Sequence, residues 1–275
     1  MGSFLRPPGF DSPGLAAVLR EGSVVCEAGR YAVRSAGKRR AQRGWSADRG
    51  AGFCDPVLLV PGFMAGDGTL RFMAGALRRQ GFRTYRSHIH ANVGCTVDVA
   101  AQLEGRLESI AQRRRGRVQI VGHSLGGMLA RGLAVRRPDL ISGVVTLGSP
   151  MLAPGAHHAS LARSLDVLVR LSRAGVPGLM TDECVAGACA RESFEESRRP
   201  IPSSVAFTAV YSRRDGIVDW RACIDPMAVS VEVSTSHIGM AIDPRVIDHV
   251  VAALQGRVGL SVVGSALEVD RGESA

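Results

Sequence analysis

The sequence lacks several features that would place it in common classes of protein. Its first residues contain no basic segment followed by an apolar one, so we expect no secretory signal and a cytoplasmic location. No apolar run is long enough to cross a bilayer, which argues against a transmembrane segment. No internal repeat is present. These absences favour an ordinary globular protein.

Lysine is almost missing. Lys38 is the only lysine among 34 basic residues, and arginine supplies the rest of the positive charge. The formal net charge of +9 could suit nucleic acid or an anionic membrane surface. The arginines are spread along the chain, however, and accompany no recognisable nucleic-acid-binding module. We therefore expect no nucleic-acid partner, while contact with a membrane surface or a lipid interface stays open.

The six cysteines are scattered, and only Cys184 and Cys189 form a close pair. A zinc site would need a second close pair at ligand spacing, so the sequence predicts no metal site, and it indicates no cofactor. A disulfide between Cys184 and Cys189 is one alternative. Without a secretory signal, the sequence favours reduced thiols at both positions.

At 275 residues, the chain is long enough for one α/β domain with an insertion. Residues 1–52 are interpreted as an N-terminal arm and linker, in which a helix precedes a flexible link over residues 35–52. We expect the main domain over residues 53–260. A peripheral C-terminal tail is expected over residues 261–275.

From residue 56, strands and helices alternate, which predicts a mainly parallel central sheet with helices on both faces. The predicted strands are residues 56–60, 82–89, 118–121, 141–147, 205–211 and 229–233. The predicted helices are residues 70–79, 97–113, 128–135, 159–173 and 245–254.

Residues 151–202 interrupt this alternation. They contain the amphipathic helix predicted at 159–173, followed by a predicted loop that carries the two close cysteines. A position between two late strands favours a small helical cap over an active site. The alternative is a helix packed on the sheet like the others.

The strongest motif is Gly-His-Ser-Leu-Gly-Gly at residues 122–127. It follows a buried strand pattern and opens a helix, so Ser124 is expected on a sharp strand-to-helix turn, the nucleophile elbow. Glycine neighbours let the strand and helix approach while the hydroxyl is pushed outward. The alternative is a tight turn in which Ser124 only caps the helix.

A serine nucleophile needs a base and a carboxylate that orients the base. Asp215 and His237 follow Ser124 in that order, each just beyond a predicted strand. Asp219 is a rival for the acid, whereas Asp243 follows the histidine and has the wrong order. The remaining histidines lie before the elbow, beside the serine, in the insertion or in the last helix: His88, His90, His123, His157, His158 and His249.

Attack on a carbonyl also requires backbone N–H groups that bind the developing oxyanion. We expect one donor at Leu125, directly after the serine. The second is expected at Phe63, because the strand at residues 56–60 runs into Pro61-Gly62. Its neighbour Met64 is a candidate wall of the substrate pocket. A Pro-Gly pair alone would indicate only a turn.

Together, these motifs resemble the α/β-hydrolase superfamily, and within it the serine lipases and esterases with a Pro-Gly-Phe oxyanion turn and this elbow sequence. The resemblance covers residues 56–254 and does not reach the N-terminal arm. It implies an α/β-hydrolase fold and a carboxylic ester hydrolase that forms an acyl-enzyme on small-molecule or lipid esters with apolar acyl chains. An acyltransferase using the same triad and a catalytically silent binding module are the alternatives. Ser124 at the elbow excludes a dehalogenase, which needs a carboxylate there.

Overall fold

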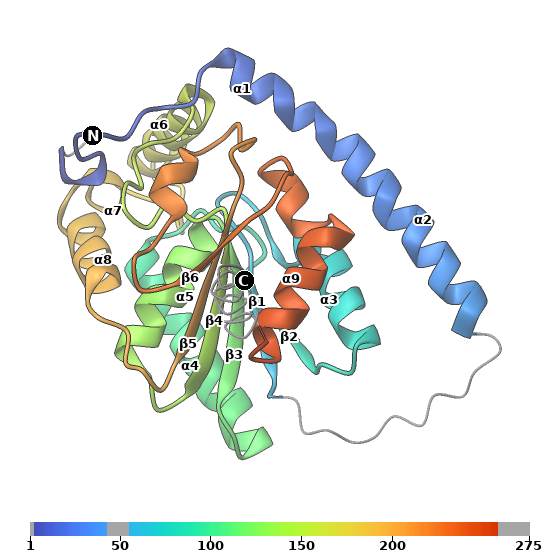
Figure 1. Cartoon of the computed structure of the whole chain (residues 1–275). Coiled ribbons are helices and arrows are strands. Elements are labelled where there is room, and N and C mark those ends of the chain that lie inside the picture. The colour runs from blue at the N-terminus through green and yellow to red at the C-terminus, as the bar shows by residue number, and fades with distance from the viewer. Residues whose placement is uncertain (1–2, 43–54, 258–275) are drawn as a thin grey trace, which may run out of the picture.

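The computed structural model describes residues 3–42 and 55–257 (Figure 1). The predicted C-terminal tail at 261–275 lies outside these residues, as does the linker segment 43–52.

A six-stranded sheet forms the centre of the described fold, in the order β2-β1-β3-β4-β5-β6. Every neighbouring pair of strands is parallel, which confirms the predicted sheet. The loops that follow the strands therefore gather at one edge of the sheet, where sites form in open α/β folds. The strands are β1 (Val57–Val60), β2 (Thr84–Arg86), β3 (Val118–His123), β4 (Ile141–Leu147), β5 (Ala206–Tyr211) and β6 (Val229–Glu232).

Helices cover both faces of the sheet, as predicted (Figure 1). On one face, Val121 and Val145 pack under α3 (Arg71–Arg79) and α9 (Pro244–Leu254). On the other face, Ile120 packs under α4 (Thr96–Arg114) and α5 (Leu125–Arg136). Alternate side chains of a strand point to opposite faces, so each inner strand supplies both cores. This arrangement is the α/β-hydrolase fold.

Three helices lie between β4 and β5: α6 (Ala159–Arg173), α7 (Asp182–Ala186) and α8 (Ala188–Arg198). The sequence predicted a loop after α6, and this prediction was wrong where the chain forms the helices α7 and α8. Helix α8 buries Ala190 and Phe194 on one face and packs against α5. Its apolar stripe is short and lies among charged residues, so the sequence pattern did not show it.

The N-terminal segment contains η1 (Ser3–Leu5), α1 (Leu15–Leu19), η2 (Arg20–Ser23) and α2 (Val24–Gln42). The link expected from residue 35 was wrong over residues 35–42, because α2 continues there. Two arginines of α2 pair with the start of α9, Arg30 with Asp243 at 2.6 Å and Arg34 with Asp248 at 2.6 Å. Figure 1 shows α2 running past α9 along one side of the molecule.

The loops contain three further 3₁₀ helices: η3 (Asp67–Leu70), η4 (Trp220–Cys223) and η5 (Ile238–Ala241). None of the helices described is both long enough and apolar enough to span a bilayer.

Candidate active site

Ser124 occupies a strained turn between β3 and α5, with φ of 52° and ψ of −122°. Non-glycine residues rarely adopt this region, and such strain is common where a fold positions a reactive side chain. A Cβ at Gly122 would collide with the Gly126 backbone, and a Cβ at Gly126 would collide with the carbonyl oxygen of Val60. Only glycine at both positions allows β3, α5 and β1 to approach this closely.

Asp215 and His237 meet in the buried interior behind this turn. Nδ1 of His237 lies 2.6 Å from Oδ2 of Asp215. The other carboxylate oxygen, Oδ1, accepts the N–H groups of Ile217 at 2.8 Å and Val218 at 2.9 Å. These bonds hold the Asp215 side chain in one orientation. A Cβ at Gly148, which follows β4, would lie only 3.0 Å from His237 Nδ1, so β4 ends directly against the pair.

The pKa of His237 is raised above the ordinary histidine value. Burial alone would lower this pKa, but the charge of Asp215, the hydrogen bond to Asp215 and the charge of Glu21 together outweigh it. With Nδ1–H donating to Asp215, Nε2 is left as a proton acceptor of increased basicity. Among the described residues, Ser124 Oγ forms no side-chain hydrogen bond, so its transfer of a proton to His237 belongs to the proposal below.

Asp219 and Asp243, the two other aspartates considered as the acid, bind other residues. Asp219 pairs with Arg221 at 2.7 Å and accepts the backbone N–H of Asp11 at 2.9 Å. Asp243 caps α9 and pairs with Arg30. Neither carboxylate hydrogen-bonds to the His237 ring.

The structure brings Phe63 and Leu125 to the cavity that Ser124 lines. Within the described part of the chain, neither backbone N–H donates to an acceptor, so both are available to a bound oxygen. Met64 differs: its N–H donates to the carbonyl of Asn92 at 3.0 Å, and its side chain is 54% exposed. Met64 does not line the cavity.

Asn92 holds the loop after β1, and the sequence analysis missed it. Its Nδ2 donates to the carbonyl of Pro61 at 2.9 Å, and its backbone N–H donates to Ala65 at 2.9 Å. Its side chain is buried. A single asparagine in a loop carries no sequence signal, and only the fold shows that it is buried and bonded.

Glu21, a buried residue of the N-terminal segment, forms hydrogen bonds to both the loop that carries Asp215 and the loop that carries His237. Glu21 Oε1 accepts the N–H of Gly216 at 2.9 Å and the N–H of His237 at 2.8 Å. Its Oε2 accepts the N–H of Ile238 at 3.2 Å. At Gly216 the backbones are so close that a Cβ would collide with the carbonyl oxygen of Ala17. The N-terminal segment is therefore part of the site.

Glu27 holds the loop that carries His237, through hydrogen bonds to Ser236, the residue directly before it. Its Oε1 accepts the backbone N–H of Ser236 at 2.8 Å, and its Oε2 accepts the Ser236 hydroxyl at 2.6 Å. The Ser236 hydroxyl in turn accepts the N–H of Gly239 at 2.9 Å. Sequence reasoning found neither glutamate, because both lie in a polar segment without a recognisable motif.

His123, directly before Ser124, hydrogen-bonds to the backbone of His237. Its Nε2 donates to the carbonyl oxygen of His237 at 3.0 Å, and the two rings lie 4.9 Å apart between centroids. Burial, together with the neighbouring His237, lowers the pKa of His123 to about 4. The ring is therefore neutral at physiological pH and can hold this bond.

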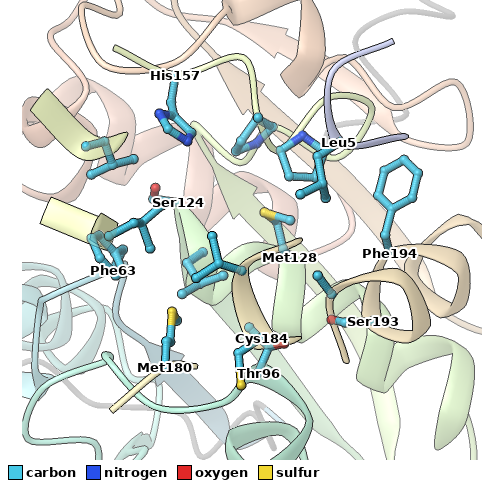
Figure 2. Close-up of a pocket in the computed structure, with 18 of the residues that line it drawn as sticks. Leu5, Phe63, Thr96, Ser124, Met128, His157, Met180, Cys184, Ser193 and Phe194 are labelled. Atoms are coloured by element: carbon cyan, nitrogen blue, oxygen red, sulfur yellow. The ribbon is translucent and has the colours of Figure 1, made fainter. Parts of the chain in front are cut away.

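Ser124 opens onto a cavity of about 130 Å³ with a mainly apolar lining. Figure 2 shows Ser124 and Phe63 towards one end and Phe194 towards the other. The walls come from the sheet loops, the insertion helices and the N-terminal segment. The apolar lining residues include Leu5, Phe63, Leu125, Met128, Leu129, Leu161, Leu165, Met180, Val185, Phe194 and Val218.

Another histidine, His157, lines the cavity together with Ser124, and Figure 2 shows both side chains. Its Nδ1 lies 3.3 Å from the carbonyl oxygen of His158, and burial lowers its pKa. No carboxylate among the described residues hydrogen-bonds to its ring. His157 therefore lacks the acid partner that His237 has.

Comparison with known proteins agrees with this fold. Residues 55–177 match the family model described as alpha/beta hydrolase fold. The mature lipase of Bacillus licheniformis has a TM-score of 0.58 and 15% identity, over 77% of this chain and 96% of its own. A metagenomic carboxyl esterase has a TM-score of 0.56 and 15% identity, over 79% and 80%. A metagenome-derived lipolytic enzyme has a TM-score of 0.52 and 17% identity, over 74% and 94%. At these identities the likeness shows the fold.

Proposed function

We propose that this chain, which has the α/β-hydrolase fold, is a carboxylic ester hydrolase of the lipase or esterase type. The observation that carries this proposal is the buried His237–Asp215 pair, joined at 2.6 Å behind the strained Ser124 turn. A serine hydroxyl is a weak nucleophile unless a base removes its proton. The raised pKa of His237 suits that base.

In the proposed reaction, Ser124 Oγ attacks the ester carbonyl while Nε2 of His237 accepts its proton. Asp215 holds the imidazole ring and stabilises its charged form. The N–H groups of Phe63 and Leu125 bind the oxyanion. His237 then gives the proton to the leaving alcohol. Water releases the acyl group from Ser124 by the same steps, again with His237 as the base.

The cavity supports esters with an apolar acyl chain. Its volume of about 130 Å³ is several times the space that one water molecule needs. Such a space suits an acyl chain of short to medium length. The relatives of known structure carry the names lipase, carboxyl esterase and lipolytic enzyme, which is consistent with this substrate class.

We propose the insertion at residues 151–202 as a cap over this cavity, because Leu161, Met180 and Phe194 form part of the wall. Helix α6 also leaves Val167 52% exposed and Leu171 44% exposed on its outer side. These two side chains are where we propose contact with a lipid interface. Met64, exposed beside the oxyanion loop, would contact the substrate only outside the cavity.

A hydrolysis profile over p-nitrophenyl esters, from acetate to palmitate, tests the proposal. Ser124→Ala serves as the blank for uncatalysed and adventitious hydrolysis. We expect kcat/KM to be highest for a short or medium acyl chain and to fall steeply towards palmitate. Wild-type protein that is no faster than Ser124→Ala on every ester would contradict the function. A maximum at palmitate would contradict the cavity argument alone.

A further inference from the structure

Three cysteines from two distant parts of the chain meet beside the cavity wall. Cys95 precedes α4 as its N-cap, Cys184 lies in α7, and Cys189 lies in the first turn of α8. Their three Sγ atoms all lie within 4.8 Å of one another. The sequence showed only the pair Cys184 and Cys189, and for that reason predicted no metal site. The fold adds Cys95 as the third sulfur.

We propose that Cys95, Cys184 and Cys189 form a binding site for a thiophilic metal ion, with zinc as the first ion to test. Thiolate sulfur is the ligand type that such soft and borderline ions select. At a Zn–S distance of about 2.3 Å, two sulfurs on one ion lie roughly 3.8 Å apart. The observed spacing, at most 4.8 Å, exceeds that value by no more than about 1 Å. Binding forms three metal–sulfur bonds and releases three thiol protons.

A buried hydroxyl beside the cluster points independently to a missing ligand. Thr96 follows Cys95 directly and lines the cavity with Cys184 (Figure 2). Its Oγ1 is buried and has no hydrogen-bond partner within the described residues. Buried hydroxyls are nearly always paired. No fourth His, Cys, Asp or Glu of the described chain joins the three sulfurs. The ion would therefore keep an open position for solvent, and we infer that this solvent would be the missing partner of the Thr96 hydroxyl.

Each cysteine binds the ion as a thiolate and must therefore lose its proton on binding. The affinity for metal should accordingly rise with pH.

A disulfide accounts for the cluster less well, because it uses two of the sulfurs and leaves the third as an unpaired thiol. A bound ion uses all three. It would also tie α7 and α8 of the insertion to the start of α4. One wall of the cavity would thereby be fixed, since Cys184 lines it.

The test uses the full chain with Ser124→Ala, so that metal binding is measured apart from any ester hydrolysis. The protein is treated with a reductant and a chelator, exchanged into buffer and titrated with Cd²⁺. Sulfur-to-cadmium absorption in the ultraviolet reports thiolate ligation. Competition with a chromogenic chelator then gives the affinity for Zn²⁺. We expect one ion per chain and a melting temperature that rises with zinc concentration.

Each cluster cysteine is then changed to serine in the same background. Cys189→Ser and Cys95→Ser change half-buried positions and keep the test valid if Cys184→Ser fails to fold. We expect each to weaken zinc binding by roughly a hundredfold or more, since loss of outer partners alone costs up to that much. Cys26→Ser, at an exposed position on α2, is the control and should bind like the parent.

Absence of sulfur-to-cadmium absorption in the parent would overturn the proposal. Equal zinc affinity in Cys189→Ser and the parent would overturn it as well. So would a native Cys184–Cys189 disulfide, seen by mass spectrometry without reductant, in a protein that binds no metal after reduction.

Discussion

Glu21 and His237 are 216 positions apart in sequence, yet Oε1 of Glu21 accepts the backbone N–H of His237 at 2.8 Å. The same oxygen accepts the N–H of Gly216, next to Asp215. One buried carboxylate therefore fixes both loops whose side chains form the His237–Asp215 pair. Its charge also contributes to the raised pKa of His237. We regard Glu21 as a positioning residue for the proposed reaction.

Glu21→Gln should lower both the rate and the basicity of the site. Hydrogen bonds to a charged acceptor contribute about 1 kcal/mol more than neutral ones, so we expect kcat/KM to fall by roughly fivefold. We expect the fall mainly in kcat, because Glu21 does not line the cavity. The acid limb of the pH profile should also move to lower pH.

Glu192→Gln, at an exposed position on α8, is the matched control and should leave the rate and the pH profile unchanged. A loss of stability in Glu21→Gln without any shift of the acid limb would show a purely structural role for Glu21.

Substitution of Asp215 and of Asp219 should affect turnover differently. Asp215→Asn removes the charge that stabilises protonated His237 and disturbs its tautomer, so we expect turnover to fall by about ten-thousandfold. Asp219→Asn should keep near wild-type turnover, because Asp219 does not hydrogen-bond to His237. It should unfold at a lower temperature, because Asp219 pairs with Arg221 and accepts the backbone N–H of Asp11. Steady-state kinetics and thermal melts measure both. Equal losses of turnover would refute the assignment of Asp215 as the acid.

The dependence of kcat/KM on pH should report the base. His237 must be neutral to accept a proton, so activity is present above its pKa and is lost as the pH falls through it. Asp215 and Glu21 raise this pKa, so the midpoint of the acid limb should lie above the ordinary histidine value of about 6.5. A neutral ester substrate avoids titration of the substrate itself. A midpoint at or below 6.5 would be inconsistent with His237 as the base.

The sequence was sufficient to predict the features that depend on local pattern. Alternating apolar runs gave the parallel sheet and its two helix layers, and the glycines around Ser124 gave the elbow. Asp215 and His237 were selected by chain order and by their places after strands, and the structure brings their side chains together. Glycine and strand patterns are local, so they can be recognised without the fold.

Glu21, Glu27 and Asn92 could not be found in this way. Each acts through backbone groups far away in sequence, as when Glu27 binds Ser236. Backbone N–H groups are the same in every residue, so their partners leave no pattern in the sequence. The helices α7 and α8 were missed for a related reason. The buried face of α8 is defined by contacts with α5, and α7 packs against α8, so neither helix shows a long apolar stripe.

His157, which lines the cavity, and His237, which pairs with Asp215, should contribute differently to turnover. We expect His237→Ala to abolish turnover to the level of Ser124→Ala. His157→Ala should keep a substantial kcat and alter KM or the preferred acyl chain, because His157 lines the cavity but has no acid partner among the described residues. The acid limb of the pH profile should be unchanged in His157→Ala. Loss of activity in His157→Ala as deep as in His237→Ala would refute this division of roles.

The most direct measurement is the reaction of the folded chain with a fluorophosphonate probe, followed by mass spectrometry of the intact protein and its peptides. The account predicts one probe per chain, attached to Ser124, no labelling of Ser124→Ala and strongly slowed labelling of His237→Ala. Folded wild-type protein that leaves Ser124 unlabelled, or labels at the same rate without His237, would contradict the claim that Ser124 is an activated nucleophile.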